Sequence, residues 1–263
     1  MAEPRINFTD GDAYERTMGA WSRLAGEVFL DWLAPAAGLR WIDVGCGSGA
    51  FTQLVVERST PAAITAIDPS EEQLVTARRR LAASRAKVLK GDAMALPFPD
   101  DRFDVAVMAL VIFFVPQPDK GVAEMVRVVR PGGTVAAYAW DILGGGFPFA
   151  PVQAELRAAG LTPPLPPSVE ASRTEALRAL WSAAGLENVE QREITVQRTF
   201  TDFDDYWWKT TGSPSLSAML AKLGPAETEA LKSQLRARLQ PDAEGRIVTS
   251  GRANAIRGRV ARR

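Results

Sequence analysis

The chain has 263 residues, of which 46% are hydrophobic, and its 31 Lys and Arg residues balance its 31 Asp and Glu residues. This length allows one large domain or one domain with a lid, and the balanced charge gives no strong attraction to nucleic acid or to an anionic membrane. The single cysteine, Cys46, excludes an internal disulfide framework and fits a reducing compartment. Histidine is absent, which removes the commonest general base and metal ligand.

No N-terminal apolar region of the signal-peptide type and no run of about 18 apolar residues is present, so we expect a cytoplasmic protein without a membrane span. Residues 1–12 have the composition of a flexible arm. From Ala13 to about Leu33 apolar residues recur every three and four positions, which predicts a helix that Gly19 could divide. Most of its apolar face should pack on a sheet. The first part could instead cover a ligand, with Tyr14, Met18, Trp21, Ser22 and Arg23.

The next feature is a glycine-rich turn that follows a short apolar run, from Trp41 to Phe51. The run suits a strand buried on both faces, and the glycines let the backbone turn sharply and approach a ligand closely. A helix from about Ala50 would offer its positive N-terminal end to that ligand. Asp43 stands at the carboxyl end of the strand, where open parallel sheets bind ligands. The turn therefore predicts a cradle for a nucleotide-type cofactor.

Strands are expected at residues 62–68, 87–89, 103–109 and 134–140, with helices at 50–58, 70–84 and 118–130 between them. This alternation predicts a parallel, doubly wound sheet. Asp68 ends the second strand, where a carboxylate is well placed to accept hydrogen bonds from a ribose diol. The same residue could simply cap the helix that begins near Ser70.

After Asp141, glycines and prolines up to residue 167 indicate a long irregular insertion. A helix at 172–184, a strand at 188–200, helices at 202–212 and 225–239, and a last strand within 246–260 follow. The aromatic residues of this half predict an apolar pocket for a flat or hydrophobic molecule, lined by Trp140, Phe147, Phe149, Trp181, Tyr206, Trp207 and Trp208. The helical position of Trp181 favours ordinary core packing, and the adjacent Trp207 and Trp208 cannot both face one side of a helix.

Several motifs in this order resemble those of class I S-adenosylmethionine-dependent methyltransferases, especially the ubiquinone/menaquinone-biosynthesis-like branch of small-molecule enzymes. They are Asp43-Val44-Gly45-Cys46-Gly47-Ser48-Gly49, Asp68, Gly91-Asp92-Ala93, Pro97-Phe98 with Phe103-Asp104, and Arg130-Pro131-Gly132-Gly133. The resemblance implies an α/β, Rossmann-like, doubly wound and mostly parallel seven-stranded sheet with helices on both faces and an inserted helical lid. It implies one domain over residues 1–263. Residues 1–34 would cover the cofactor, 35–141 would form the cofactor-binding core, and 142–263 would hold the lid insertion, the last helices and the C-terminal strands.

By this resemblance the cofactor is S-adenosyl-L-methionine. The turn would contact its methionine portion, Asp43 its amino group, Asp68 its ribose and Asp92 the adenine amine. Arg23 would either pair with the cofactor carboxylate or be a surface charge, and Gln73 would by default be a solvated helical residue. The full set of implied cofactor-binding residues is Tyr14, Trp21, Arg23, Asp43, Gly45, Cys46, Gly47, Asp68, Pro69, Gln73, Gly91, Asp92, Ala93, Ala109 and Leu110.

The implied reaction is methyl transfer to an oxygen, nitrogen or carbon of a small aromatic or hydrophobic acceptor, by proximity and desolvation. Many relatives have a histidine after the fourth strand, but Leu110-Val111-Ile112-Phe113-Phe114 contains none. We therefore assign no catalytic base and no metal. Asp141, Tyr138, Glu170 and Asp204 remain candidates for a base.

Two alternatives remain. One is a cofactor-binding protein without catalysis. The other is an NAD(P)-dependent oxidoreductase, since Gly45, Gly47 and Ala50 also fit the dinucleotide fingerprint. Asp43 argues against the oxidoreductase, because its charge would repel a pyrophosphate. We expect a small-molecule acceptor as the partner, no nucleic acid, and a monomer or homodimer.

Overall fold

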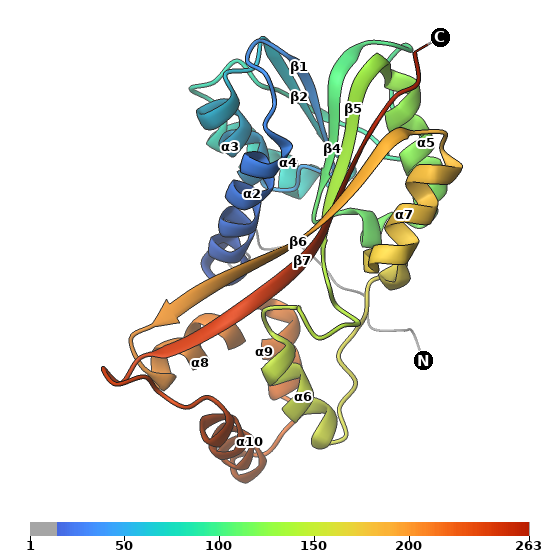
Figure 1. Ribbon diagram of the computed structural model, residues 1–263. Coiled ribbons are helices and arrows are strands. Elements are labelled where there is room, and N and C mark those ends of the chain that lie inside the picture. The colour runs from blue at the N-terminus through green and yellow to red at the C-terminus, as the bar shows by residue number, and fades with distance from the viewer. Residues whose placement is uncertain (1–14, 263) are drawn as a thin grey trace.

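Within residues 15–262, which the computed structural model describes, seven strands form one sheet in the order β3-β2-β1-β4-β5-β7-β6 (Figure 1). The strands are β1 (Arg40–Val44), β2 (Ala63–Asp68), β3 (Lys87–Lys90), β4 (Phe103–Ala109), β5 (Val129–Trp140), β6 (Glu187–Phe200) and β7 (Ile247–Arg259). Neighbours among β1 to β5 are parallel, and β7 runs antiparallel between β5 and β6. This confirms the predicted Rossmann-like, mostly parallel sheet.

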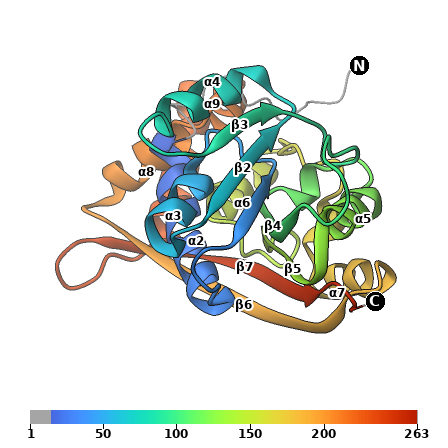
Figure 2. The same ribbon diagram turned by 90° about the horizontal axis from the view of Figure 1, so that it is seen from above.

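Helices cover both faces of the sheet (Figures 1 and 2). On one face lie α2 (Ala20–Leu33), α3 (Ala50–Ser59) and α4 (Glu71–Arg80), and on the other lie α5 (Pro118–Val128) and α7 (Thr174–Ala183). The register of α2 follows from its apolar residues, because Trp21, Ala25 and Phe29 recur every four positions and are all buried. Phe29 packs on Tyr138 of β5 with 4.6 Å between ring centroids. This contact fixes α2 over the centre of the sheet.

The predicted break at Gly19 is a change of helix type. A π-helical turn, η1 (Glu15–Gly19), runs directly into α2. Two further single helical turns are present. One, η2 (Ile112–Phe114), follows β4, and the other, η3 (Val169–Ser172), precedes α7. Among residues 15–262 the longest helices are too short or too polar to cross a bilayer.

A group of helices lies beyond the far ends of β6 and β7 (Figure 1). It consists of α6 (Ala150–Ala158), α8 (Phe203–Thr211), α9 (Pro214–Leu220) and α10 (Pro225–Arg238). The strand pair reaches this group because β6 and β7 stay paired to Phe200 and Ile247, well past the point where β5 ends against Ala253.

The residue pattern did not predict two of these helices. It favoured an irregular insertion over residues 142–167, whereas the family resemblance implied a helical lid, and α6 forms there with Val152 and Leu156 buried one turn apart. Likewise α9 occupies the segment expected to separate two helices. Both helices have a proline in their first turn, where proline needs no partner for its missing N–H. The prolines therefore start helices in this part of the chain.

Candidate active site

A cavity of about 290 Å³ lies where β1, β2 and β4 end, and we call it the glycine-turn pocket. Its lining comes from the first turn of α2, the glycine turn, the starts of α3 and α4, the end of β4, the loops after β2, β3 and β4, and one residue of β5. It contains these implied cofactor-binding residues: Arg23, Gly45, Cys46, Gly47, Asp68, Pro69, Gln73, Gly91, Asp92, Ala93, Ala109 and Leu110. Motifs that are far apart in the sequence therefore meet at one edge of the sheet.

Some implied residues lie elsewhere. Trp21 packs in the core with 1% exposure, because it shares the sheet-facing side of α2 with Phe29, and it does not line the pocket. Asp43 is buried behind the turn and is not among the lining residues. Tyr14 lies outside the described residues. The default of a solvated Gln73 is wrong, since this side chain is 6% exposed and lines the pocket.

The amides of the glycine turn are largely occupied within the protein. Gly45 and Cys46 both donate to the carbonyl oxygen of Ile67 at 2.8 Å. Gly47 donates to Oδ2 of Asp68 at 2.9 Å, and Gly49 donates to the carbonyl of Cys46 at 2.9 Å. Gly45 has φ +78°, and a Cβ there would collide with Val111, so only glycine fits. The turn thus offers a ligand close backbone contact more than free N–H donors.

Asp68 joins the turn to the next helix. Oδ2 accepts from Gly47, and Oδ1 accepts from the amide of Ser70 at 2.9 Å. Ser70 itself caps α4, since its hydroxyl accepts from the amide of Gln73. Burial raises the pKa of Asp68, and the two backbone hydrogen bonds partly offset this. Each carboxylate oxygen keeps a further lone pair for a ligand hydroxyl.

Asp43 is fully buried and has few partners. Oδ2 accepts a hydrogen bond of 2.6 Å from the hydroxyl of Thr52, and Oδ1 has no partner in the described part of the chain. Burial raises the pKa of Asp43 to about 7, the hydrogen bond from Thr52 lowers it, and the charge of Asp68 raises it further. A cation at the neighbouring pocket would stabilise this carboxylate.

Asp43 should make the ligand-free protein less stable as the pH rises. Its pKa in the folded protein, about 7, is above its value of 3.8 when exposed, so the folded state holds the proton more tightly. The free energy of unfolding therefore loses its contribution as the pH rises from about 4 to 7. Asp43→Asn should flatten this part of the profile in urea unfolding measured between pH 5 and 7.5. Identical profiles for the variant and the wild type would contradict the assignment.

A second cavity, of about 130 Å³, adjoins the first, and we call it the lid pocket. Leu110 and Phe114 line both cavities, so the two meet just after β4. The lid pocket is mainly apolar and is lined by Thr17, Met18, Leu110, Phe113, Phe114, Trp140, Ile142, Phe147, Phe149, Gln153, Pro163, Pro164, Leu165, Pro166, Ser213, Ser215, Leu216 and Met219.

The aromatic pocket was predicted only in part. Trp140, Phe147 and Phe149 line the lid pocket, but Tyr206, Trp207 and Trp208 do not, so the prediction is wrong for these three. Trp181 belongs to the core on α7, as its helical spacing favoured, and its Nε1 donates to the carbonyl of Val135 at 3.1 Å. Trp207 stacks on Phe203, and Trp208 is 67% exposed.

Residues 42–137 match a family model described as a methyltransferase domain. The chain is 42% identical over 115 residues to the ubiquinone/menaquinone biosynthesis C-methyltransferase UbiE of Roseobacter denitrificans, covering 42% of this chain and 46% of that protein. It is 43% identical over 95 residues to the chloroplastic 2-methyl-6-phytyl-1,4-hydroquinone methyltransferase 2 of Oryza sativa subsp. japonica, covering 36% of this chain and 27% of that protein. The chain thus aligns with less than half the length of these curated relatives.

The fold is similar to that of the YcgJ protein of Bacillus subtilis, with a TM-score of 0.60 and 19% identity over 91% of this chain and 99% of that one. Residues 42–137 are therefore similar to methyltransferase domains, and the two curated relatives named above are methyltransferases. The matched segment holds β1 to β4 and most of β5, with the glycine turn at its start. The family resemblance of the sequence motifs is confirmed.

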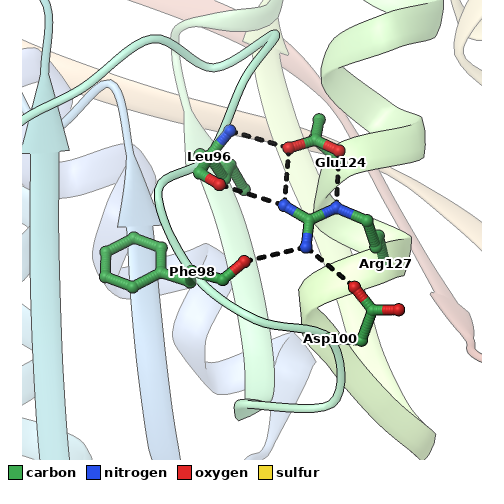
Figure 3. A network of polar contacts seen from close by, with 5 residues as sticks. All are labelled: Leu96, Phe98, Asp100, Glu124 and Arg127. Atoms are coloured by element: carbon green, nitrogen blue, oxygen red, sulfur yellow. Dashed lines mark hydrogen bonds and ion pairs between the residues drawn. The ribbon is translucent and has the colours of Figure 1, made fainter.

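In the matched segment the loop after β3 is tied to α5 (Figure 3). Asp92 begins the loop and accepts from the amide of Met94 through Oδ1 at 2.8 Å. A few residues on, Leu96 donates its amide to Glu124 at 2.7 Å. The loop is therefore anchored by a side chain outside the pocket, a few residues beyond Ala93, the last loop residue that lines the glycine-turn pocket.

Arg127 completes this attachment (Figure 3). Its guanidinium donates to the carbonyl oxygens of Leu96 at 3.0 Å and Phe98 at 2.8 Å, and to Asp100 at 2.8 Å. It also forms two bonds of 2.7 Å with Glu124, which lower the pKa of that carboxylate while burial opposes them. We call Glu124 and Arg127 the loop clamp. Planar bidentate pairing of this kind gives direction as well as energy.

Leu110, at the boundary between the two pockets, has a left-handed backbone with φ +62°. Its amide donates to the carbonyl of Tyr138 at 2.8 Å, which holds the chain in this conformation. Left-handed geometry costs a residue with a Cβ about 1–2 kcal/mol. The strain lies where β4 leaves the sheet, and residues held in this way cluster at functional sites.

The remaining polar candidates have protein partners. Arg23 lines the pocket, but it forms ion pairs with Glu27 at 3.1 Å and with Glu57 at 3.4 Å on the surface. These pairs favour the second of its two predicted roles, that of a surface charge. Cys46 is buried, and burial raises the pKa of its thiol, which does not suit a nucleophile.

Of the four candidates for a base, only Tyr138 lines the glycine-turn pocket, and none lines the lid pocket. Asp141 is held by Arg252, Glu170 by Arg173, and Asp204 by Arg236.

Some pocket residues had no role in the sequence-based set. Phe51 and Leu54 lie on the first turns of α3, directly after the glycine turn. Their position next to that turn in the sequence is a signal that could have identified them. Val111 and Pro116 follow β4, beyond the implied Ala109 and Leu110. Tyr138 reaches the pocket because β5 pairs with β4, and no local sequence signal shows which residues such pairing brings together.

Proposed function

We propose that the protein is a methyltransferase that binds S-adenosylmethionine in the glycine-turn pocket and methylates a small apolar molecule held in the lid pocket. The observation that carries this proposal is the junction of the two cavities at Leu110 and Phe114. A donor and an acceptor bound on either side of this junction would meet there. The names of the two quinone-type methyltransferase relatives make hydroquinones the first acceptors to test.

The charges around the glycine-turn pocket favour a cationic cofactor. Asp68 and Asp92 line it, and Asp43 lies behind it with an unpartnered oxygen in the described structure. These carboxylates suit a ligand with an ammonium and a sulfonium group and disfavour a pyrophosphate. The occupied amides of Gly45, Cys46, Gly47 and Gly49 point the same way, because a dinucleotide needs such donors. Both observations argue against an NAD(P)-dependent oxidoreductase.

Within the proposal each side chain has a binding task. Asp68 accepts bonds from the ribose hydroxyls, and Asp92 accepts from the adenine amine while Ala93 packs on the ring. The methionine portion lies along Gly45 to Gly47, with its carboxylate toward the N-terminal end of α3. Asp43 stabilises its ammonium group from behind the turn.

When bound, S-adenosylmethionine supplies a methyl group already activated by its positive sulfur. The residues at the junction, Leu110 and Phe114, would hold the reacting atom of the acceptor against that methyl group. The chain's own contribution is alignment and a dry environment, provided by Leu110 and Phe114 between the pockets and by Phe113 in the wall of the lid pocket. Such positioning can supply roughly 7–11 kcal/mol in favourable cases.

Calorimetry with S-adenosylhomocysteine and with NAD, followed by assays of S-adenosylhomocysteine release, tests this function. We expect S-adenosylhomocysteine to bind and NAD not to bind. Release should appear with at least one member of a panel of hydroquinones, phenols and amines. Binding without release across the whole panel would favour the non-catalytic alternative. Binding of NAD but not of S-adenosylhomocysteine would overturn the proposal.

A further inference from the structure

The end of α4 packs directly against the glycine turn. Gly49, the last residue before α3, has a left-handed backbone with φ +80°. A Cβ added there would lie 3.1 Å from Cδ1 of Leu81 and 3.2 Å from Cβ of Ala77. Because Gly49 has no side chain, the helix and the turn approach each other closely. The turn can therefore be held from the end of this helix.

Arg80, the last residue of α4, adds a polar attachment at this place. Its Nη1 donates to both oxygens of Ser48, at 2.9 Å to the carbonyl and at 2.8 Å to the hydroxyl. Ser48 belongs to the glycine turn, is buried and lines the glycine-turn pocket, whereas Arg80 does not line it. Hydrogen bonds from a charged donor are stronger than those between neutral groups. Arg80 therefore fixes the position of Ser48 from outside the pocket.

The other end of α4 is attached to the same turn. Asp68 accepts from the amides of Gly47 and Ser70, and Ser70 caps this helix. The helix thus holds two successive residues of the turn, one through Asp68 at its start and the other, Ser48, through Arg80 at its end. A turn that is fixed in this way has less conformational freedom to lose when a ligand binds.

We infer that Arg80 is a positioning residue, which through Ser48 holds the glycine turn in the shape that binds the amino-acid portion of the cofactor. The inference rests on the proposed function, which it deepens by adding a residue outside the sequence motifs. The adenosine portion should bind without this attachment. The hydrogen bonds of Asp68 and Asp92 in the described structure go to backbone amides and do not involve Arg80.

Calorimetry tests the inference with S-adenosylhomocysteine and with 5′-methylthioadenosine, which lacks the amino-acid portion. In Arg80→Met the affinity for S-adenosylhomocysteine should fall about tenfold, because the bonds from the charged donor to Ser48 are lost. The affinity for 5′-methylthioadenosine should stay within about twofold of the wild-type value. Arg80→Lys should recover most of the lost affinity, since an ammonium group can donate to the same two oxygens.

Arg78→Met is the matched control. Burial raises the pKa of the Cys46 thiol and the charge of Arg78 partly offsets this rise, so the charge of Arg78 acts at the glycine turn. Its guanidinium, however, pairs with Glu71 on the surface and makes no hydrogen bond to Ser48 in the described structure. The control removes a positive charge from the same helix without detaching the turn. It should bind both ligands as the wild type does.

The outcomes separate the inference from the proposed function. Equal losses for the two ligands in Arg80→Met would mean that Arg80 only stabilises the fold, and would overturn the inference. An unchanged affinity for S-adenosylhomocysteine in that variant, an equal loss in Arg78→Met, or equal affinity of the wild type for the two ligands would overturn it too. Failure of the wild type to bind S-adenosylhomocysteine would instead overturn the proposed function. If Arg80→Met does not fold, Arg80→Gln replaces it and should show the same dependence on the ligand.

Discussion

Replacing Asp68 by Ala is expected to weaken the binding of S-adenosylhomocysteine by about 1–3 kcal/mol, measured by calorimetry. The carboxylate orients the turn through the amide of Gly47, and in our proposal it also binds the ribose hydroxyls. Asp68→Asn should lie between the wild type and the Ala variant, because an amide keeps only one accepting oxygen. An unchanged affinity in the Ala variant would remove Asp68 from the site.

A double-mutant cycle separates the ribose contact from the structural role of Asp68. S-adenosylhomocysteine and its 2′-deoxy analogue are titrated into the wild type and into Asp68→Ala. The wild type should lose affinity for the deoxy analogue, whereas the variant should bind both ligands nearly equally. If the wild type and the variant lose the same factor on deoxygenation, Asp68 acts only by holding the turn.

Replacing Arg127 by Met is expected to weaken S-adenosylhomocysteine binding by about 1–2 kcal/mol, although the clamp lies outside the pocket. The change removes the hydrogen bonds to the carbonyls of Leu96 and Phe98 and leaves Glu124 without its counter-charge. The loop that begins at Asp92 then has more freedom, and fixing it costs binding free energy. The free energy of unfolding should also fall, by about 2–3 kcal/mol in urea denaturation.

The matched control for this variant is Arg130→Met. Arg130 pairs with Asp104, which Arg40 also holds, and its hydrogen bonds in the described structure go to Asp104 and Pro131 and not to the loop. This control should leave cofactor affinity unchanged. The 6-oxo analogue of S-adenosylhomocysteine has an oxygen in place of the adenine amine, so it tests whether the loop is correctly positioned. The preference for S-adenosylhomocysteine over this analogue should fall in Arg127→Met alone. Equal discrimination in all three proteins would mean that the clamp contributes stability but does not position the loop.

The cofactor half of the molecule could be predicted because its signals are local. The glycine turn needs glycine at Gly45 for steric reasons, and the strand ends at Asp68 and Asp92 stand at fixed spacings from that turn. These residues meet in space because parallel strands share one carboxyl edge. The roles of individual residues stay predictions, as does the division of the chain at residues 34 and 141.

The acceptor half could not be predicted to the same degree, because an aromatic residue carries no information about which way it faces across distant elements. Trp181 and Trp140 look alike in sequence, yet Trp181 bonds to Val135 in the core and Trp140 reaches the lid pocket. Trp21 is buried through the register of α2, which composition does not reveal. Ser213 and Leu216 reach the lid pocket at the start of α9, a helix that the residue pattern did not predict.

The two pockets divide the chain almost cleanly. Among residues 15–262, every residue that lines the glycine-turn pocket falls between Ser22 and Tyr138, whereas most of the lid pocket comes from Trp140 onward. Of the same described residues, only Leu110 and Phe114 line both pockets. In our proposed function the choice of acceptor can therefore be changed by grafting the segments after β5 and β6, without disturbing the residues that bind the methyl donor. The same division explains why kinship over residues 42–137 identifies the donor and leaves the recipient to be found by experiment.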